Sequence, residues 1–238
     1  PSSVTVDRVS DRKDILEQLG KTSLLADRAA VLGLSAYRQR AYDLLTSRAT
    51  KEALEIDKED QTVRDRYGRT SYGQSVLMAR RLVEAGVRFV TVYYSRSIGG
   101  WDTHKQNFSK LKDSRLPITD QTFSALLEDL DQRGLLDETL VYWTGDFGRT
   151  PKINKDAGRD HWPPCQTVIL AGGGVQGSTV IGASDKTGAY PLSDPHLPDD
   201  ITATVFHALG LDPKIEIRDQ LERPMPISDG TPIHGLFG

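Results

Sequence analysis

Carboxylate and imidazole side chains follow two apolar segments of the chain, where each segment gives way to glycine-rich sequence. Asp102 and His104 come after the first of these segments, and Asp146 and His161 come after the second. Catalytic zinc sites are built from such oxygen and nitrogen donors, with three protein ligands and one position left for water or substrate. The types and order of these residues therefore predict a metal-centred hydrolytic site.

The spacing of these residues favours the binding of one shared metal ion. In an extended segment, side chains two residues apart point to the same side, so Asp102 and His104 can face one ion. His161 would complete a set of one carboxylate and two imidazoles, which suits a Zn²⁺-like ion. Asp146 can reach a second ion. The alternative is structural, because an Asp-x-His loop also occurs without a metal and Asp146 lies in a segment with turn chemistry of its own.

Arg149 is the candidate for binding an anionic group. Its guanidinium is planar and matches the oxygens of phosphate or sulfate, so we assign it a catalytic role beside the ion. A structural ion pair is the alternative for this side chain. Asp160 and His161 form a second acidic and imidazole pair, and a local salt bridge of Asp160 with Arg149 or Arg159 is the equal alternative.

The composition is that of a globular protein and excludes several classes. Of 238 residues, 37% are hydrophobic and 26% are charged, which suits one α/β domain or two small domains. The net charge of −3 gives no electrostatic reason to expect nucleic acid or an anionic membrane as partner. No apolar run is long enough to span a membrane. Cys165 is the single cysteine, which excludes an intrachain disulfide and a cysteine-based zinc cage.

Helical and extended patterns alternate along the chain. The expected elements are polar helices over 7–66, a helix from Ser71 to Gly86, a strand over 87–94, a helix over 118–133, strands over 139–144 and 167–171, and a helix from Asp199 or Asp200 to Gly210. Short apolar strands that alternate with helices predict an α/β fold with a mostly parallel sheet covered on both faces. Residues 67–238 are expected to form one compact unit, with 1–66 as a helical annex or connection.

The position of His161 requires one of two arrangements. In open α/β sheets, ligands bind beyond the carboxyl ends of the strands, where the loops converge. Asp102 and Asp146 satisfy this rule, but His161 precedes the strand over 167–171. Either that strand is antiparallel, or the loop over 147–162 folds back across the edge of the sheet.

Six motifs of the chain together resemble a known family. They are Arg80-Arg-Leu-Val-Glu-Ala-Gly86, Gly100-Trp-Asp-Thr-His104, Asp146-Phe-Gly-Arg-Thr-Pro151, Gly158-Arg-Asp-His-Trp162, Ala171-Gly-Gly-Gly-Val175 and Asp200-Ile-Thr-Ala-Thr-Val-Phe-His-Ala-Leu-Gly210. In order and coverage they are similar to domain of unknown function 1501, a large bacterial group of exported proteins. That group in turn resembles the alkaline phosphatase and sulfatase superfamily.

The resemblance implies a three-layer α/β/α sandwich of the alkaline phosphatase type, with a metal site at the edge of the sheet. Asp102 and His104 look like the ligand pair of the first metal, His161 like its second imidazole, and Asp146 like the carboxylate of a neighbouring metal. Zinc is the ion expected first, with Ca²⁺, Mn²⁺ or Mg²⁺ as alternatives. The resemblance also implies an exported, periplasmic protein.

The chain departs from the superfamily pattern in three places. Phe147 stands where a histidine ligand would follow Asp146, and the Asp-x-His spacing of Asp102 and His104 is shorter than usual. The N-terminal part, with an early metal-binding Asp and the Ser/Thr nucleophile, is absent. The chain is therefore expected to be the C-terminal portion of a longer protein, with most of the metal ligands but without the nucleophile.

Two functions are compatible with these observations. The first is metal-dependent hydrolysis of phosphate or sulfate esters. Its substrate would be an anionic ester or a sulfated glycan, and its partner the missing N-terminal half of the same protein. The second is a catalytically inactive exported module for binding or assembly, for instance on sulfated polysaccharide. Phe147 in place of a ligand favours the second function.

Overall fold

The computed structural model describes most of the chain beyond residue 46. The described residues are 47–94, 100–219 and 221–238, with Ile15, Tyr37, Gln39, Arg40 and Asp43. Contacts divide the chain into two units, one formed by residues 1–63 and 77–91 and the other by residues 64–76 and 92–238. Most of the helical segment expected before residue 47 lies outside the described residues, and the boundary expected at residue 66 stays a prediction.

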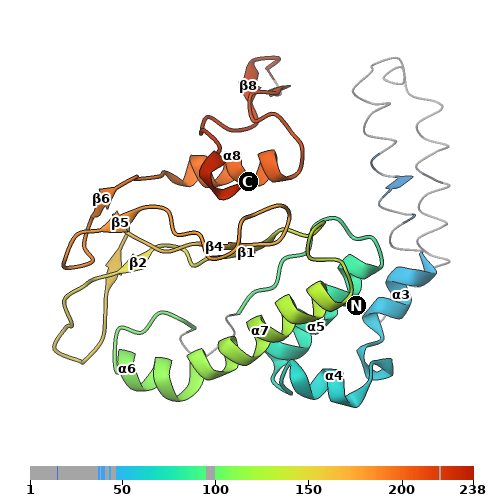
Figure 1. Ribbon diagram of the computed structural model, residues 1–238, viewed down its shortest axis with the longest axis horizontal. Helices are drawn as coiled ribbons and strands as arrows, with labels where there is room; N and C mark the ends of the chain where they lie inside the picture. Colours follow the sequence, from blue (N-terminus) through green and yellow to red (C-terminus); the bar gives the residue numbers. More distant parts are fainter. Residues whose placement is uncertain are drawn as a thin grey trace. The chain divides into compact units, whose positions relative to one another are not determined.

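Helices and strands are mixed along the chain (Figure 1). The helices are α3 (Arg48–Leu54), η1 (Ile56–Lys58), α4 (Gln61–Arg66), α5 (Ser71–Glu84), α6 (Asn107–Lys110), the π-helical turn η2 (Leu111–Arg115), α7 (Leu116–Gln132), α8 (Pro198–Ala208) and η3 (His234–Leu236). The strands are β1 (Val141–Trp143), β2 (Gly148–Arg149), β3 (His161–Trp162), β4 (Ile169–Ala171), β5 (Ala183–Ser184), β6 (Pro191–Ser193), β7 (Glu216–Arg218) and β8 (Pro224–Pro226). No described helix is long and apolar enough to cross a membrane.

Three helices expected from apolar periodicity are confirmed as α5, α7 and α8. Glycine ends them as predicted: Gly86 and Gly210, for example, have φ angles of 88° and 74°, which residues with a Cβ rarely adopt. The N-cap of α5 is Thr70 and not the predicted Ser71, because Thr70 Oγ1 accepts the backbone N–H of Gly73 at 3.0 Å.

Within the described ranges, every sheet consists of two antiparallel strands. The pairs are β1–β4, β2–β3, β5–β6 and β7–β8. The mixed α/β class is confirmed, whereas the described residues do not form the mostly parallel, three-layer sheet. A parallel neighbour needs a crossover connection, usually a helix. Between β1 and β4 the chain instead turns back through the hairpin β2–β3, so β4 returns antiparallel to β1.

The prediction of a strand over 87–94 is wrong, because these residues are not extended into a strand and have no ladder partner among the residues that the structure describes. Their β-branched and aromatic side chains favour strands, but a strand also needs a neighbour that accepts and donates its backbone hydrogen bonds. The side chains are not buried either: Phe89 is 78% exposed and Tyr93 is 85% exposed.

In the first unit, two arginines of α5 converge on one carboxylate. Arg80 and Arg81 approach Glu59 Oε2 at 2.8 and 2.6 Å, and the Arg80 side chain is only 1% exposed. The Glu59 side chain is 11% exposed. Ion pairing therefore compensates the burial of these charges.

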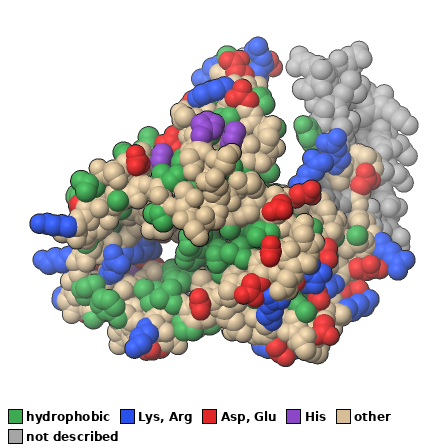
Figure 2. Space-filling model, in the orientation of Figure 1, with side chains coloured by type: hydrophobic (Ala, Val, Ile, Leu, Met, Phe, Trp, Pro, Cys, Tyr) green, Lys and Arg blue, Asp and Glu red, His purple; other side chains and the backbone are tan. Residues whose placement is uncertain are grey.

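In the second unit, helix α7 lies along the β1–β4 pair, and Figure 1 shows α8 on the other side of that pair. An apolar groove between α7 and the strands is lined by residues that include Leu116, Phe123, Leu127, Trp143 and Ile169. Figure 2 shows apolar side chains gathered over this part of the molecule. Phe123 of α7 contacts Trp143 of β1, with ring centroids 6.0 Å apart. This contact positions β1, whose end leads into the loop that carries Asp146.

A row of aromatic side chains positions the loop that carries Asp102. Tyr72 stacks on Tyr94 with ring centroids 3.9 Å apart, and Trp101 contacts Tyr94 at 5.4 Å and Trp143 of β1 at 6.4 Å. Aromatic pairs of this kind contribute about 0.5–1.5 kcal/mol each beyond the area they bury. Trp101 therefore packs against β1 and holds the neighbouring Asp102 beside it.

Tyr67 fastens the segment before α5 to α7. Its side chain is fully buried, and its hydroxyl donates a hydrogen bond to Asp129 Oδ2 at 2.9 Å. Thr122 Oγ1 donates to the Tyr67 carbonyl at 3.0 Å, and Arg133 Nε donates to the other oxygen of Asp129 at 2.8 Å. The buried carboxylate thus has a donor on each oxygen.

Replacing Tyr67 by phenylalanine should lower the free energy of unfolding by about 1–3 kcal/mol, because Asp129 Oδ2 loses this buried donor. Urea denaturation measures the change. Tyr93→Phe, at an exposed position, is the control and should leave stability unchanged. Equal stability of both variants would show that the buried hydrogen bond does not fasten α7.

Candidate metal centre

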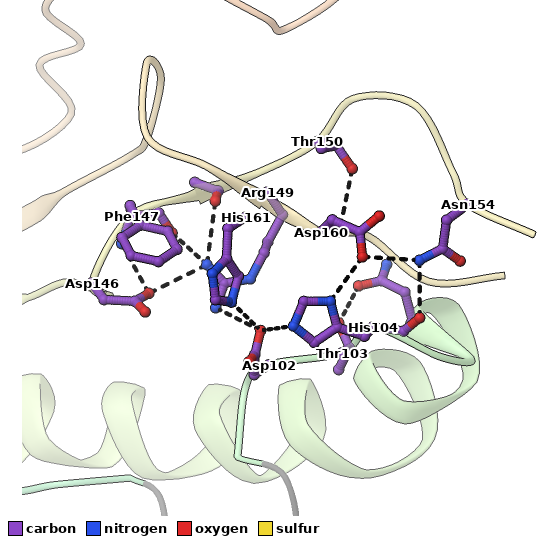
Figure 3. Close-up of polar contacts among 12 residues, drawn as sticks. Asp102, Thr103, His104, Asp146, Phe147, Arg149, Thr150, Asn154, Asp160 and His161 are labelled. Carbon is purple, nitrogen blue, oxygen red and sulfur yellow. Dashed lines mark hydrogen bonds and ion pairs between the residues drawn. The ribbon is translucent and has the colours of Figure 1, made fainter. Parts of the chain in front are cut away.

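Three of the predicted metal ligands come together in the structure. His104 Nε2 and His161 Nε2 lie 3.0 and 2.9 Å from the same atom, Asp102 Oδ1. One ligand atom from each of these residues lies within 4.8 Å of the others, close enough for one ion (Figure 3). The expectation that Asp102, His104 and His161 form a possible metal-binding group is therefore confirmed.

The hairpin β2–β3 places His161 at this site. Arg149 pairs with His161 across the hairpin, and Gly148 pairs with Trp162. The side chain of Trp162 packs away from the ligands, since its Nε1 donates to the Ala189 carbonyl at 2.6 Å. The antiparallel return of β4 explains why His161 precedes a strand and still reaches Asp102, as the first of the two arrangements considered for it requires.

Backbone hydrogen bonds join the loop of His104 to the loop between β2 and β3. Arg159 N donates to the Thr103 carbonyl at 3.1 Å, Gln106 N to Asp156 O at 3.1 Å, and Asn107 N to Ala157 O at 2.8 Å. These bonds hold together two segments that are far apart in the sequence.

Gly158 allows the two loops to approach this closely. A Cβ at position 158 would lie 1.9 Å from the carbonyl oxygen of His104, far inside van der Waals contact. The loop itself is shaped by Asn154, whose Oδ1 accepts the backbone N–H groups of Asp156 at 3.0 Å and Gly158 at 2.9 Å. A side chain at position 158 would separate His104 from the loop.

Asp102 lies among positively charged or hydrogen-bonding partners. Desolvation raises the pKa of Asp102, but the hydrogen bond from His161 and the charges of His104, His161 and Arg149 outweigh it. The pKa of this carboxyl therefore lies below its ordinary value, and the group stays ionised, as a metal ligand must.

Both ring nitrogens of His104 face a carboxylate. Nδ1 lies 2.8 Å from Asp160 Oδ1, and Nε2 lies 3.0 Å from Asp102 Oδ1. The hydrogen bond to Asp160 raises the pKa of His104 above its ordinary value; desolvation opposes this change, and the nearby charge of Asp102 adds to it.

Asp146 does not belong to the group that can share an ion. Its Oδ1 accepts the Phe147 N–H at 2.8 Å and lies 3.3 Å from Arg149 Nη1, which is the turn chemistry considered for it. Its role as ligand of a second metal stays a prediction. Desolvation raises its pKa, but hydrogen bonds from Phe147 and Arg149 and the arginine charge hold it below the ordinary value.

Arg149 connects the two acidic residues that follow the apolar segments. Its Nη2 lies 3.3 Å from Asp102 Oδ1 and its Nη1 lies 3.3 Å from Asp146 Oδ1, while Nη1 also donates to the Phe147 carbonyl at 2.8 Å. The side chain is 15% exposed, and its Nε is buried without a hydrogen-bond partner among the described residues. The structural ion pair considered for Arg149 is thus present, and its catalytic role stays a prediction.

Phe147 packs on the site. Its ring meets the His161 ring edge-on at 4.6 Å, and the guanidinium carbon of Arg149 lies 5.1 Å from its centre. Phe147 therefore supports a ligand residue without offering a ligand atom of its own.

Two further residues of the site were not found from the sequence. A local salt bridge with Arg149 or Arg159 was one alternative for Asp160, but its carboxylate contacts His104. Asn154 gives one amide proton to Asp160 Oδ1 at 3.1 Å and one to the His104 carbonyl at 3.0 Å. The adjacency of Asp160 to His161 was the only local signal, because the partner lies 56 residues away.

Replacing Gly158 by alanine should push the two loops apart and lower the free energy of unfolding by about 1–3 kcal/mol, the usual cost of overpacking. Urea denaturation and zinc affinity measure the two effects, and we expect both to fall. Gly145→Ala is the control, because a Cβ there meets nothing within 4 Å. If Gly158→Ala matched this control in both measurements, the close approach would not maintain the site.

Comparison with known proteins identifies a family but no characterised relative. A family model described as a protein of unknown function (DUF1501) matches residues 1–237. No curated protein and no solved structure matches the chain. Because the model covers nearly every residue, the chain belongs to the DUF1501 family of proteins of unknown function.

Proposed function

We propose that the protein is a metal-dependent hydrolase of phosphate or sulfate esters, and that this chain supplies most of its metal ligands. The observation that supports the proposal best is the convergence of one carboxylate oxygen and two imidazole nitrogens, from Asp102, His104 and His161. Catalytic zinc sites have three protein ligands and an open position, whereas structural sites are closed by a fourth protein ligand.

The donor set favours zinc over the other ions considered. Imidazole nitrogen suits Zn²⁺, while Ca²⁺, Mg²⁺ and Mn²⁺ prefer oxygen ligands. Bound by these three residues, zinc would polarise an ester oxygen and stabilise the negative charge that develops during hydrolysis. The side chains of Asp102, His104 and His161 are 43%, 44% and 47% exposed, which leaves them accessible to a substrate.

Arg149 is assigned to the substrate in this proposal. Its guanidinium lies 3.3 Å from Asp102 Oδ1, so its positive charge is beside the proposed ion. A planar guanidinium matches two oxygens of a phosphate or sulfate group. Asp146, which contacts the same guanidinium, is proposed to contribute its carboxylate to a neighbouring ion.

The proposal includes parts of a longer protein. The nucleophile would come from an N-terminal half, which would also complete a three-layer α/β/α fold of the alkaline phosphatase type around the β1–β4 pair. The whole protein would be exported to the periplasm, where sulfated glycans and other anionic esters are candidate substrates.

A binding module without catalytic activity is the second candidate. The packing of Phe147 against His161 favours it, because an apolar ring occupies the place where the superfamily pattern has a histidine ligand. The pairing of Arg149 with Asp102 and Asp146 also favours it, since the guanidinium is already engaged. In this case the site would bind sulfated polysaccharide and turn over no ester.

His161→Ala should weaken zinc binding by more than the roughly 10–100-fold that loss of an outer-shell partner costs, because a ligand itself is removed. Competition with a chromophoric chelator measures the affinity of the purified protein. His196→Ala is the matched control, since His196 lies near Asp200 and outside the ligand group. A wild-type protein that binds no divalent ion would overturn the proposal.

Turnover distinguishes the two candidate functions. A full-length protein that contains this chain should hydrolyse chromogenic phosphate or sulfate esters, and a chelator should abolish the activity because the ion stabilises the developing charge. Added zinc should restore it. Binding of sulfated polysaccharide without turnover of any ester would instead support the binding module.

A further inference from the structure

The ring nitrogen of His104 that faces away from Asp102 contacts a carboxylate outside the ligand group. Asp160 Oδ1 lies 2.8 Å from His104 Nδ1, and Figure 3 shows the ring between Asp160 and Asp102. A carboxylate accepts hydrogen bonds, so this 2.8 Å contact favours the form of His104 that has its proton on Nδ1, while Nε2 faces the other carboxylate, Asp102, at 3.0 Å. In the neutral ring the other nitrogen, Nε2, is then left with the lone pair that a metal ion requires.

The opposite nitrogen of this ring points at the proposed ion position. His104 Nε2 is the atom that lies 3.0 Å from Asp102 Oδ1, beside the Nε2 of His161. If the proton moved from Nδ1 to Nε2, the ring could not bind an ion at that position. The tautomer that Asp160 favours is therefore the tautomer that the site needs.

Asp160 is itself fixed in place by neighbouring groups. Its backbone N–H donates to Thr150 Oγ1 at 3.0 Å, and its carbonyl accepts the Thr150 N–H at 2.8 Å. Asn154 Nδ2 donates to Asp160 Oδ1 at 3.1 Å and to the His104 carbonyl at 3.0 Å. Asn154 thus joins the carboxylate to the backbone of the residue whose ring the carboxylate orients.

We infer that Asp160, held by Asn154, is a positioning residue that fixes the tautomer and orientation of the metal ligand His104. Its significance for the ion rests on the proposed function. Carboxylate–histidine–metal arrangements orient the ligand ring and increase its basicity, and their loss lowers metal affinity roughly 10–100-fold. Asp160 acts through His104 and not as a ligand.

The test combines the tautomer of His104 with zinc affinity in three variants. Asp160→Ala removes the acceptor, and Asp160→Asn keeps the shape of the side chain but not its charge. Asp156→Ala is the control, because it removes a carboxylate from the same loop without removing a partner of His104. Long-range ¹H–¹⁵N spectra of the ion-free protein, at a pH where the ring is neutral, report which nitrogen carries the proton.

Wild-type protein and Asp156→Ala should show His104 protonated at Nδ1. Asp160→Ala should lose this preference and bind zinc roughly 10–100-fold more weakly, with Asp160→Asn between them. An unchanged tautomer together with unchanged affinity in a folded Asp160→Ala protein would overturn the inference. A loss of affinity with the tautomer unchanged would also overturn it, because Asp160 would then not act through the proton position of His104.

The spectra separate this inference from the proposed function. If wild-type protein binds no zinc, the hydrolase proposal fails, but the tautomer of the ion-free protein still decides whether Asp160 positions the ring. If zinc binds and Asp160→Ala changes neither tautomer nor affinity, the proposed function stands and the inference fails.

Discussion

The close approach of Gly158 to the carbonyl of His104 is the constraint on which the candidate site depends. It lets the loop between β2 and β3 form backbone hydrogen bonds with Thr103, Gln106 and Asn107, although these segments are distant in the sequence. The aromatic row from Tyr72 to Trp143 positions the loop that carries Asp102. The paired strands β2 and β3 position the other loop, which connects them. The ligand group is therefore assembled by loop contacts and not by the edge of a parallel sheet.

The same side chains can form a hydrogen-bond network or a set of metal ligands. Without an ion, Asp102 accepts a hydrogen bond from His161 and lies close to His104 Nε2 and to Arg149. With an ion, the Nε2 atoms of His104 and His161 would coordinate it, while the hydrogen bond from His104 Nδ1 to Asp160 would remain. The network keeps the donor atoms close together, so that little rearrangement is needed for binding.

Local sequence patterns predicted the elements whose formation depends on residues that are close together in the sequence. Apolar periodicity and terminal glycines predicted α5, α7 and α8, and residue types predicted the group of Asp102, His104 and His161. Pairing was harder to predict, because an apolar run indicates a strand but not its neighbour. The residues 87–94 therefore formed no strand, and β4 proved antiparallel to β1. His104 was not predicted as the partner of Asp160 for the same reason, since the two residues are brought together only by the fold.

X-ray absorption at the zinc edge of the purified, zinc-loaded protein tests the central claim most directly. The account predicts nitrogen and oxygen ligands at about 2.0–2.2 Å, together with the outer scattering of two imidazole rings. His104 and His161 would supply those rings. A protein that retains no zinc, or a zinc spectrum without imidazole scattering, would contradict the account, because the ion would then not be bound where Asp102, His104 and His161 converge.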